Sequence, residues 1–253
     1  MPAGWPLIGR AEELRFIGGL TVRGNGPSGV VLAGAPGVGK TRLARAALAA
    51  AEQRGAVTRW AAATASARGL PLGAFAATLG AVGSDPTLLL RQAGEALLSG
   101  AGRGGAVLGV DDAHLLDELS ATLVHQLVLR REATVVLTLR SGEPAPDAVT
   151  GLWKDGHLHR LELRPLAAEQ TASLLEGVLG GPVGSAAAHD LWTITRGNTP
   201  YLQQLVDGEL DAGRLEKVGG VWRWSGRPQL TPGLAELLHR SALVPGGRCR
   251  TAG

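Results

Sequence analysis

Short apolar runs alternate with segments of helical periodicity as far as Pro165. Five such runs predict strands, at residues 30–33, 56–60, 106–110, 134–139 and 158–163. Apolar residues at helical spacing predict a helix at residues 43–51 and another at residues 119–127, each between two of these strands. Gly55 would end the first helix, and Asp117 is a suitable N-cap for the second. Because strands that alternate with helices usually form parallel sheets, the pattern predicts an α/β fold with a mainly parallel sheet.

Beyond Pro165 the pattern becomes helical. Helices are predicted at residues 168–179, at residues 185–195 and at residues 200–210, and Ser185 can cap the second of them. Gly219-Gly220 then separates two short apolar runs, which is a strong signal for a β-hairpin over residues 215–224. A last helical signal at residues 234–239 runs into a tail without periodicity.

The chain therefore divides by pattern into three segments. Residues 1–164 form the α/β core, residues 165–213 a small helical subdomain, and residues 214–253 a hairpin, a partial helix and an irregular tail.

Composition excludes several classes of protein. A chain of 253 residues with 45% apolar and 19% charged residues is typical of a globular protein rather than a disordered one. The net charge of +3 comes without a clustered basic stripe, so it is weak evidence for nucleic-acid binding. The single cysteine, Cys249, excludes an internal disulfide framework and zinc sites built on cysteine pairs. We see no membrane-spanning run and no secretory signal, and expect a cytoplasmic protein.

One motif carries clear chemistry. Residues 34–41 read Gly-Ala-Pro-Gly-Val-Gly-Lys-Thr and match the phosphate-binding pattern G-x-x-x-x-G-K-[ST]. Glycines let successive backbone N–H groups turn toward a phosphate, and the helix that follows adds its positive N-terminal end. Lys40 is expected to reach the β- and γ-phosphates and Thr41 to bind Mg²⁺. The predicted strand before the motif and helix after it favour this interpretation over an ordinary glycine-rich turn.

Three further residues are candidates at the carboxyl ends of predicted strands. Asp111 would hold Mg²⁺ through water, and Asp112 could orient or deprotonate the attacking water. Arg140 could sense or stabilise the γ-phosphate. The alternatives are a solvated turn or helix cap for the aspartates, a purely structural role for Asp112, and a surface salt bridge for Arg140. His114 is interpreted as a hydrogen-bonding residue at a helix start rather than as a ligand.

With these residues in place, the chain resembles the N-terminal ATPase module of the large LuxR-type transcriptional regulators, within the STAND branch of AAA+ P-loop NTPases. The resemblance covers about residues 5–240 in the family's order. The matching stretches are Leu7 to Leu14 (Leu-Ile-Gly-Arg-Ala-Glu-Glu-Leu), Gly34 to Thr41, Val110 to His114, Leu139 to Glu143, Leu161 to Leu166 and Arg196 to Tyr201.

The resemblance implies a P-loop core, a helical lid and the start of a winged-helix region, which correspond to the three segments above. It implies that Ile8, Gly9 and Arg10 line the adenine side and that Arg140 is the sensor-1 residue. The lid's Gly-x-Pro element reads Gly-Asn-Thr-Pro here, which places Pro200 one position later than in the common form. The full cofactor-binding set is Ile8, Gly9, Arg10, Gly34, Ala35, Pro36, Gly37, Val38, Gly39, Lys40, Thr41, Arg42 and Pro200.

The expected function is a switch that binds ATP or ADP with Mg²⁺, hydrolyses ATP slowly and self-associates according to the nucleotide bound. Members of the family end in a DNA-binding helix-turn-helix beyond the length of this chain, so sensing and direct DNA binding are not expected of it. Two alternatives stay open. One is a P-loop kinase that phosphorylates a small acceptor, with Arg160, Arg164 and Arg196 as contributors, and the other is a nucleotide-binding regulator without turnover.

Overall fold

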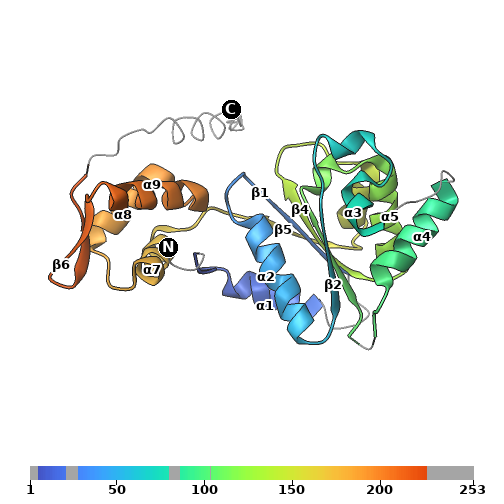
Figure 1. Ribbon diagram of the computed structural model, residues 1–253, viewed down its shortest axis with the longest axis horizontal. Coiled ribbons are helices and arrows are strands. Elements are labelled where there is room, and N and C mark those ends of the chain that lie inside the picture. The colour runs from blue at the N-terminus through green and yellow to red at the C-terminus, as the bar shows by residue number, and fades with distance from the viewer. Residues whose placement is uncertain (1–4, 21–27, 80–85, 103, 227–253) are drawn as a thin grey trace, which may run out of the picture. The chain divides into compact units, whose positions relative to one another are not determined.

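The chain forms two compact units in a computed structural model, which describes residues 5–20, 28–79, 86–102 and 104–226 (Figure 1). One unit comprises Arg10–Gly34 and Gly39–Leu163, and we call it the sheet unit. The other comprises Met1–Gly9, Ala35–Val38 and Arg164–Gly253, and we call it the helical unit. The segment at residues 234–239 and Cys249 lie outside the described residues.

The sheet unit contains a five-stranded parallel sheet in the order β2-β3-β4-β1-β5, which confirms the predicted α/β class. The strands are β1 (Gly29–Gly34), β2 (Val57–Ala62), β3 (Ala106–Asp111), β4 (Thr134–Arg140) and β5 (His159–Leu163). Every residue of β1 is buried, which explains its unbroken apolar run in the sequence. In the β1–β4 register Gly34 pairs with Arg140, so the glycine-rich loop leaves the sheet beside that arginine.

Helices cover both faces of this sheet. In Figure 1, α1 (Ala11–Leu20) and α2 (Lys40–Gln53) lie on one face, and α3 (Ala76–Leu79), α4 (Pro86–Leu98) and α5 (Glu118–Leu129) lie on the other. The short α6 (Asp147–Lys154) packs on α5, and the 3₁₀ turns are η1 (Ala67–Gly69), η2 (Gly73–Phe75) and η3 (Ala113–Leu115). The main core joins Val31, Leu108 and Leu137 of the sheet to Leu123 and Leu127 of α5.

Asp117 caps α5, as the sequence predicts. Its carboxylate accepts hydrogen bonds from the backbone N–H groups of Leu119 and Ser120, at 3.1 and 3.0 Å. The same carboxylate also accepts from the N–H groups of Leu72 and Gly73, at 3.1 and 3.2 Å. The cap therefore ties the start of α5 to a loop more than 40 residues earlier in the chain.

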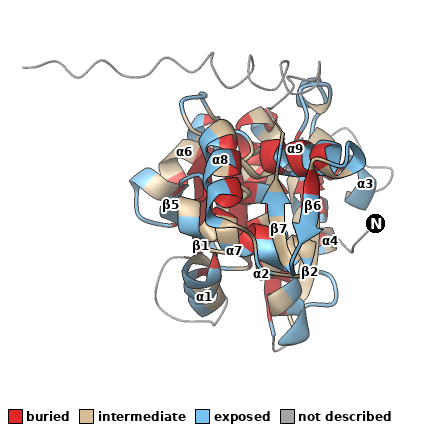
Figure 2. Cartoon of the chain, turned by 90° about the vertical axis from the view of Figure 1, so that its left-hand side faces the viewer, coloured by how far each residue is buried: buried red, intermediate tan, exposed pale blue. Residues whose placement is uncertain are grey.

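The helical unit contains three helices and a hairpin. The helices are α7 (Ala168–Leu179), α8 (Ser185–Thr195) and α9 (Thr199–Asp211), which confirms the three predicted here. Ser185 was expected to cap α8, but it is the first helical residue and Gly184 occupies the cap position. The helices bury a common core that includes Leu174, Leu191 and Leu202, and their outer faces are exposed (Figure 2).

The predicted hairpin is present as β6 (Leu215–Val218) and β7 (Val221–Trp224), an antiparallel pair. Gly219 and Gly220 have positive φ angles of 60° and 84°, the conformation that a two-residue turn between antiparallel strands requires. Trp222 and Trp224 each donate an indole hydrogen bond to the helices, to the Leu179 carbonyl at 3.0 Å and to the Glu209 carboxylate at 2.7 Å. Both indoles therefore cover an edge of the helical core.

Every helix in the described ranges falls short of the length and apolarity that crossing a bilayer requires.

Candidate nucleotide-binding site

The glycine-rich loop connects the interior strand β1 to helix α2. Gly37 and Gly39 have φ angles of 81° and 93°, which side chains with a Cβ rarely adopt. The first hydrogen bond of α2 runs from the N–H of Leu43 to the carbonyl of Gly39, at 2.9 Å. The backbone N–H groups at the start of α2 form the positive end of this helix.

Lys40 lies at the start of α2 with its side chain directed back to the end of β1. Its Nζ donates a hydrogen bond to the carbonyl of Gly34 at 2.9 Å, and the residue is buried. Burial lowers the pKa of this amine, because a charged group loses solvation there, while the carboxylates of Asp112 and Asp111 act in the opposite direction. The amine is therefore held at the strand end beside both aspartates.

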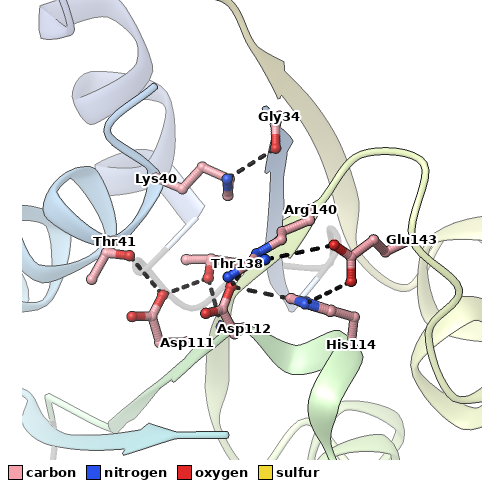
Figure 3. Close-up of polar contacts among 9 residues, drawn as sticks. All are labelled: Gly34, Lys40, Thr41, Asp111, Asp112, His114, Thr138, Arg140 and Glu143. Atoms are coloured by element: carbon pink, nitrogen blue, oxygen red, sulfur yellow. Dashed lines mark hydrogen bonds and ion pairs between the residues drawn. The ribbon is translucent and has the colours of Figure 1, made fainter. Parts of the chain in front are cut away.

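Asp111 joins residues from three elements. Its Oδ1 accepts hydrogen bonds from the hydroxyls of Thr41 on α2 and Thr138 on β4, at 2.8 and 2.6 Å (Figure 3). The Thr138 hydroxyl in turn accepts from the backbone N–H of Asp112 at 2.8 Å. The predicted pair Thr41 and Asp111 is therefore brought into direct contact, at the carboxyl end of the sheet.

Thr138 is a site residue that the sequence reasoning missed. It is fully buried, and it lies on the same face of β4 as Arg140, two positions later. The available signal was a hydroxyl within the mainly apolar run of this strand, two positions before a candidate arginine. A buried hydroxyl needs a hydrogen-bond partner, and the neighbouring strand end supplies the two aspartates.

The oxygen atoms at this position fit Mg²⁺. Hydroxyl and carboxylate oxygens, together with nucleotide phosphates and water, are the ligands that this ion prefers. Thr41 Oγ1 and Asp111 Oδ1 lie 2.8 Å apart beside the loop, and the hydrogen bond from Thr138 orients the carboxylate. Thr41 and Asp111 are the residues that would hold the ion.

Asp112, His114, Arg140 and Glu143 form a second cluster at the same edge (Figure 3). Arg140 Nε lies 3.7 Å from Asp112 Oδ1, and Arg140 Nη1 lies 3.6 Å from Glu143 Oε1. His114 Nε2 lies 3.4 Å from Glu143 Oε2, and His114 Nδ1 lies 3.9 Å from Asp112 Oδ1. Arg140 thus forms ion pairs, as the alternative interpretation expected, but its partners belong to the site itself.

His114 differs from the prediction made for it. The residue lies in η3 and is only 2% exposed, yet neither ring nitrogen makes a hydrogen bond within the described part of the chain. Burial lowers its pKa, against the opposing effect of the carboxylates of Asp112 and Glu143. The imidazole is therefore favoured in its neutral form, which has one proton to donate.

The remaining predicted residues have separate environments. Arg10 belongs to the sheet unit, is buried and pairs with Glu13 at 3.0 Å. Ile8 and Gly9 belong to the helical unit, where the Gly9 carbonyl accepts a hydrogen bond from Gln170 on α7 at 3.1 Å. Pro200 lies exposed in the first turn of α9.

Four residues of the glycine-rich loop, Ala35–Val38, also group with the helical unit. Asn198 donates from Nδ2 to the Pro36 carbonyl at 3.0 Å, and the Thr199 N–H donates to the Gly37 carbonyl at 3.3 Å. A side chain at Gly37 would collide with that of Asn198.

Comparison with known proteins gives a family match over part of the chain. The AAA ATPase domain family matches residues 6–94, which include the glycine-rich loop. No curated protein sequence matches the chain.

Solved structures share the fold at low sequence identity. The chain is similar to the Aeropyrum pernix ORC1 protein solved in complex with DNA, at 20% identity and a TM-score of 0.60, over 84% of this chain and 63% of that one. It is also similar to the Thermotoga maritima RuvB Holliday junction branch migration motor, at 19% identity and a TM-score of 0.52, over 83% of this chain and 67% of that one. A third similar structure is Saccharomyces cerevisiae Hsp104 in complex with casein, at 18% identity and a TM-score of 0.57, over 82% of this chain and 38% of that one.

The chain thus spans less than two thirds of the ORC1 protein's length. Residues 6–94 thus match the AAA ATPase domain family, and the similar solved structures show the α/β fold of P-loop NTPases, which confirms the predicted fold class.

Proposed function

We propose that this chain is the ATP-binding switch module of a STAND-type, LuxR-family transcriptional regulator, and that it hydrolyses ATP slowly. The hydrogen bond between Thr41 and Asp111, beside the buried amine of Lys40, is the observation that carries the proposal. A strand-end carboxylate that meets the hydroxyl of a phosphate-binding loop is the arrangement that holds Mg²⁺ with a nucleoside triphosphate in P-loop proteins.

Each residue of the site has a role in this proposal. Lys40 exchanges its hydrogen bond with the Gly34 carbonyl for the β- and γ-phosphates, and the loop N–H groups bind phosphate oxygens. Mg²⁺ held by Thr41 and Asp111 would neutralise phosphate charge. Asp112 accepts a proton from the attacking water. The oxygen of that water bonds to the γ-phosphorus, and the bond between the γ-phosphorus and the bridging oxygen breaks, so that ADP leaves.

The switch depends on the γ-phosphate. In this proposal Arg140 distinguishes ATP from ADP, and its position at the end of the strand next to β1, in register with Gly34, supports that role. In the helical unit, the N-terminal part of α9 hydrogen-bonds to the backbone of Pro36 and Gly37. This contact supports the proposal that the lid responds to the loop, that Ile8, Gly9 and Pro200 contact the nucleotide, and that self-association follows its state.

The kinase alternative is less well supported. Two of the three arginines it needs are engaged elsewhere: Arg160 pairs with Glu162 at 3.4 Å, and the Arg196 guanidinium lies 5.8 Å from the ring centre of Trp192. Acceptor-dependent release of ADP across a panel of metabolites would favour the kinase. Regulation without turnover is distinguished by the absence of phosphate release from a chain that binds ATP.

Calorimetric titration with ATP and with ADP, both with Mg²⁺, tests the proposal. Lys40→Ala should weaken ATP binding by about tenfold to a hundredfold, the effect of one charge-assisted hydrogen bond. Lys154→Ala removes a lysine from the end of α6 and is the matched control. Unchanged ATP affinity in the Lys40 variant would contradict the proposal, and a slow release of phosphate that the variant lacks would support it.

A further inference from the structure

Four side chains at the carboxyl edge of the sheet form a closed ring. Asp112 contacts Arg140, Arg140 contacts Glu143, Glu143 contacts His114, and His114 returns to Asp112. The four separations range from 3.4 to 3.9 Å, which is longer than ordinary hydrogen bonds. The two contacts of Arg140 are ion pairs, and the two contacts of His114 involve an imidazole favoured in its neutral form. Two carboxylates therefore share one guanidinium in this ring.

The buried member of the ring is His114, and it distinguishes the cluster from an ordinary surface salt bridge. The Arg140 and Glu143 side chains are 43% and 47% exposed, so their pair alone would have little effect. The imidazole beneath them is almost fully buried, with no hydrogen bond at either nitrogen within the described residues. A buried polar group without a partner is costly and calls for a functional explanation.

The shorter of its two contacts indicates what His114 does. A neutral imidazole can donate to only one of the two carboxylates, and the approach to Glu143 is closer than the approach to Asp112, 3.4 against 3.9 Å. Glu143 is therefore the carboxylate toward which the Nε2 side of His114 is directed, and Glu143 in turn pairs with the Nη1 end of Arg140. Without Glu143, Arg140 would have only Asp112 within the ring and would turn fully toward it.

We propose that Glu143, anchored by His114, is a positioning residue that keeps the Arg140 guanidinium shared between two carboxylates and therefore available to the γ-phosphate. The pair also keeps Arg140 from fully neutralising Asp112, which has to accept a proton. This inference rests on the proposed ATPase function. It predicts that Glu143 and His114 affect the distinction between ATP and ADP and the rate of hydrolysis, and leave ADP binding unchanged.

The test compares ATP and ADP affinities by calorimetry and hydrolysis in single-turnover assays. Glu143→Gln should lower both the preference for ATP over ADP and the hydrolysis rate by about tenfold, because Arg140 loses its orientation toward the γ-phosphate. His114→Leu should have the same effect. His114→Gln should retain most of the preference for ATP and most of the hydrolysis rate, because the glutamine amide can donate from near the position of Nε2. Glu118→Gln is the matched control, since Glu118 is an exposed carboxylate at the start of α5 and is not in the ring.

A double-mutant cycle separates positioning from general stabilisation. If Glu143 acts through Arg140, Glu143→Gln should have no further effect in an Arg140→Ala background. The inference would be overturned if either the Glu143 or the Arg140 variant behaved like the wild type. It would also be overturned if the effects of the two substitutions were additive, or if ADP affinity fell as much as ATP affinity. Glu143 is exposed, so its variant remains informative even where His114→Leu fails to fold. Absence of ATP binding by the wild-type chain would instead refute the proposed function itself.

Discussion

Thr138 offers a direct test of how the sheet orients the two aspartates. Its hydroxyl donates to Asp111 Oδ1 at 2.6 Å and accepts from the N–H of Asp112 at 2.8 Å, in a fully buried position. Thr138→Val keeps the shape of the side chain and removes both hydrogen bonds. The Asp112 N–H then loses its acceptor, and the Asp111 carboxylate is left with the hydroxyl of Thr41.

The size of the effect follows from the two bonds. A hydrogen bond to a charged group contributes about 1.5–3 kcal/mol and a buried N–H left unpaired costs about 1–3 kcal/mol. The added methyl group returns about 0.8 kcal/mol of apolar burial. We therefore expect the free energy of unfolding to fall by about 2–5 kcal/mol, which in a unit of this size lowers the melting temperature by roughly 4–20 °C.

The same change should weaken the binding of Mg²⁺. Residues that orient a metal ligand typically contribute about tenfold to a hundredfold in metal affinity. Calorimetric titration of ATP at a series of Mg²⁺ concentrations should therefore show a higher Mg²⁺ requirement in Thr138→Val. Thermal unfolding followed by circular dichroism measures the stability.

Two controls accompany this experiment. Thr138→Ser keeps the hydroxyl and should retain the Mg²⁺ dependence, and Thr134→Val makes the same chemical change at the other end of β4. A Thr138→Val protein with wild-type stability and wild-type Mg²⁺ dependence would refute the reasoning, because it would mean that neither hydrogen bond orients the site.

Two further predictions concern stability alone. Asp117→Ala should destabilise the sheet unit by about 2–3 kcal/mol in denaturant unfolding, because the carboxylate accepts four backbone hydrogen bonds; Glu118→Ala next to it should change little. The hydrogen bonds from Arg214, and to a lesser extent from Trp224, lower the pKa of Glu209 below its ordinary value of 4.5. A lowered folded-state pKa stabilises the protein at neutral pH, and this contribution disappears as the pH falls through the folded-state value. Thermal unfolding of Glu209→Gln should therefore show a deficit at pH 7 that shrinks in acid, and a deficit independent of pH would argue against it.

The strands and the glycine-rich loop were predictable because they depend on local pattern. A fully buried strand such as β1 has an unbroken apolar run, and the loop motif has fixed spacing. Helix α4 was missed although Leu89, Ala93 and Leu97 repeat every four residues and are all buried. That stripe follows a stretch rich in Gly and Pro, which obscured the start of the periodic segment.

The roles of Thr138, His114 and Glu143 were not predictable from local pattern. Each depends on which strands are neighbours, and the sequence does not state that β4 lies between β1 and β3. This placement brings a threonine of β4 against the aspartates of β3, and a glutamate of the following loop against a histidine of η3. Their chemistry appears only once the strand order is known.

The strand order also has a consequence for how the chain is made. Strand β1 leaves the ribosome before its partners do. Within the described residues it pairs with β4 and β5, and each paired residue follows its partner in β1 by more than 100 positions. A nascent chain that has not yet reached Arg140 therefore offers β1, and the loop attached to it, no strand to pair with. Contacts so distant along the chain form slowly, and unpaired apolar strands are prone to aggregate. We expect nucleotide binding to begin only after β4 and β5 have been synthesised, and chaperones that shield apolar strands to act on this chain before that point.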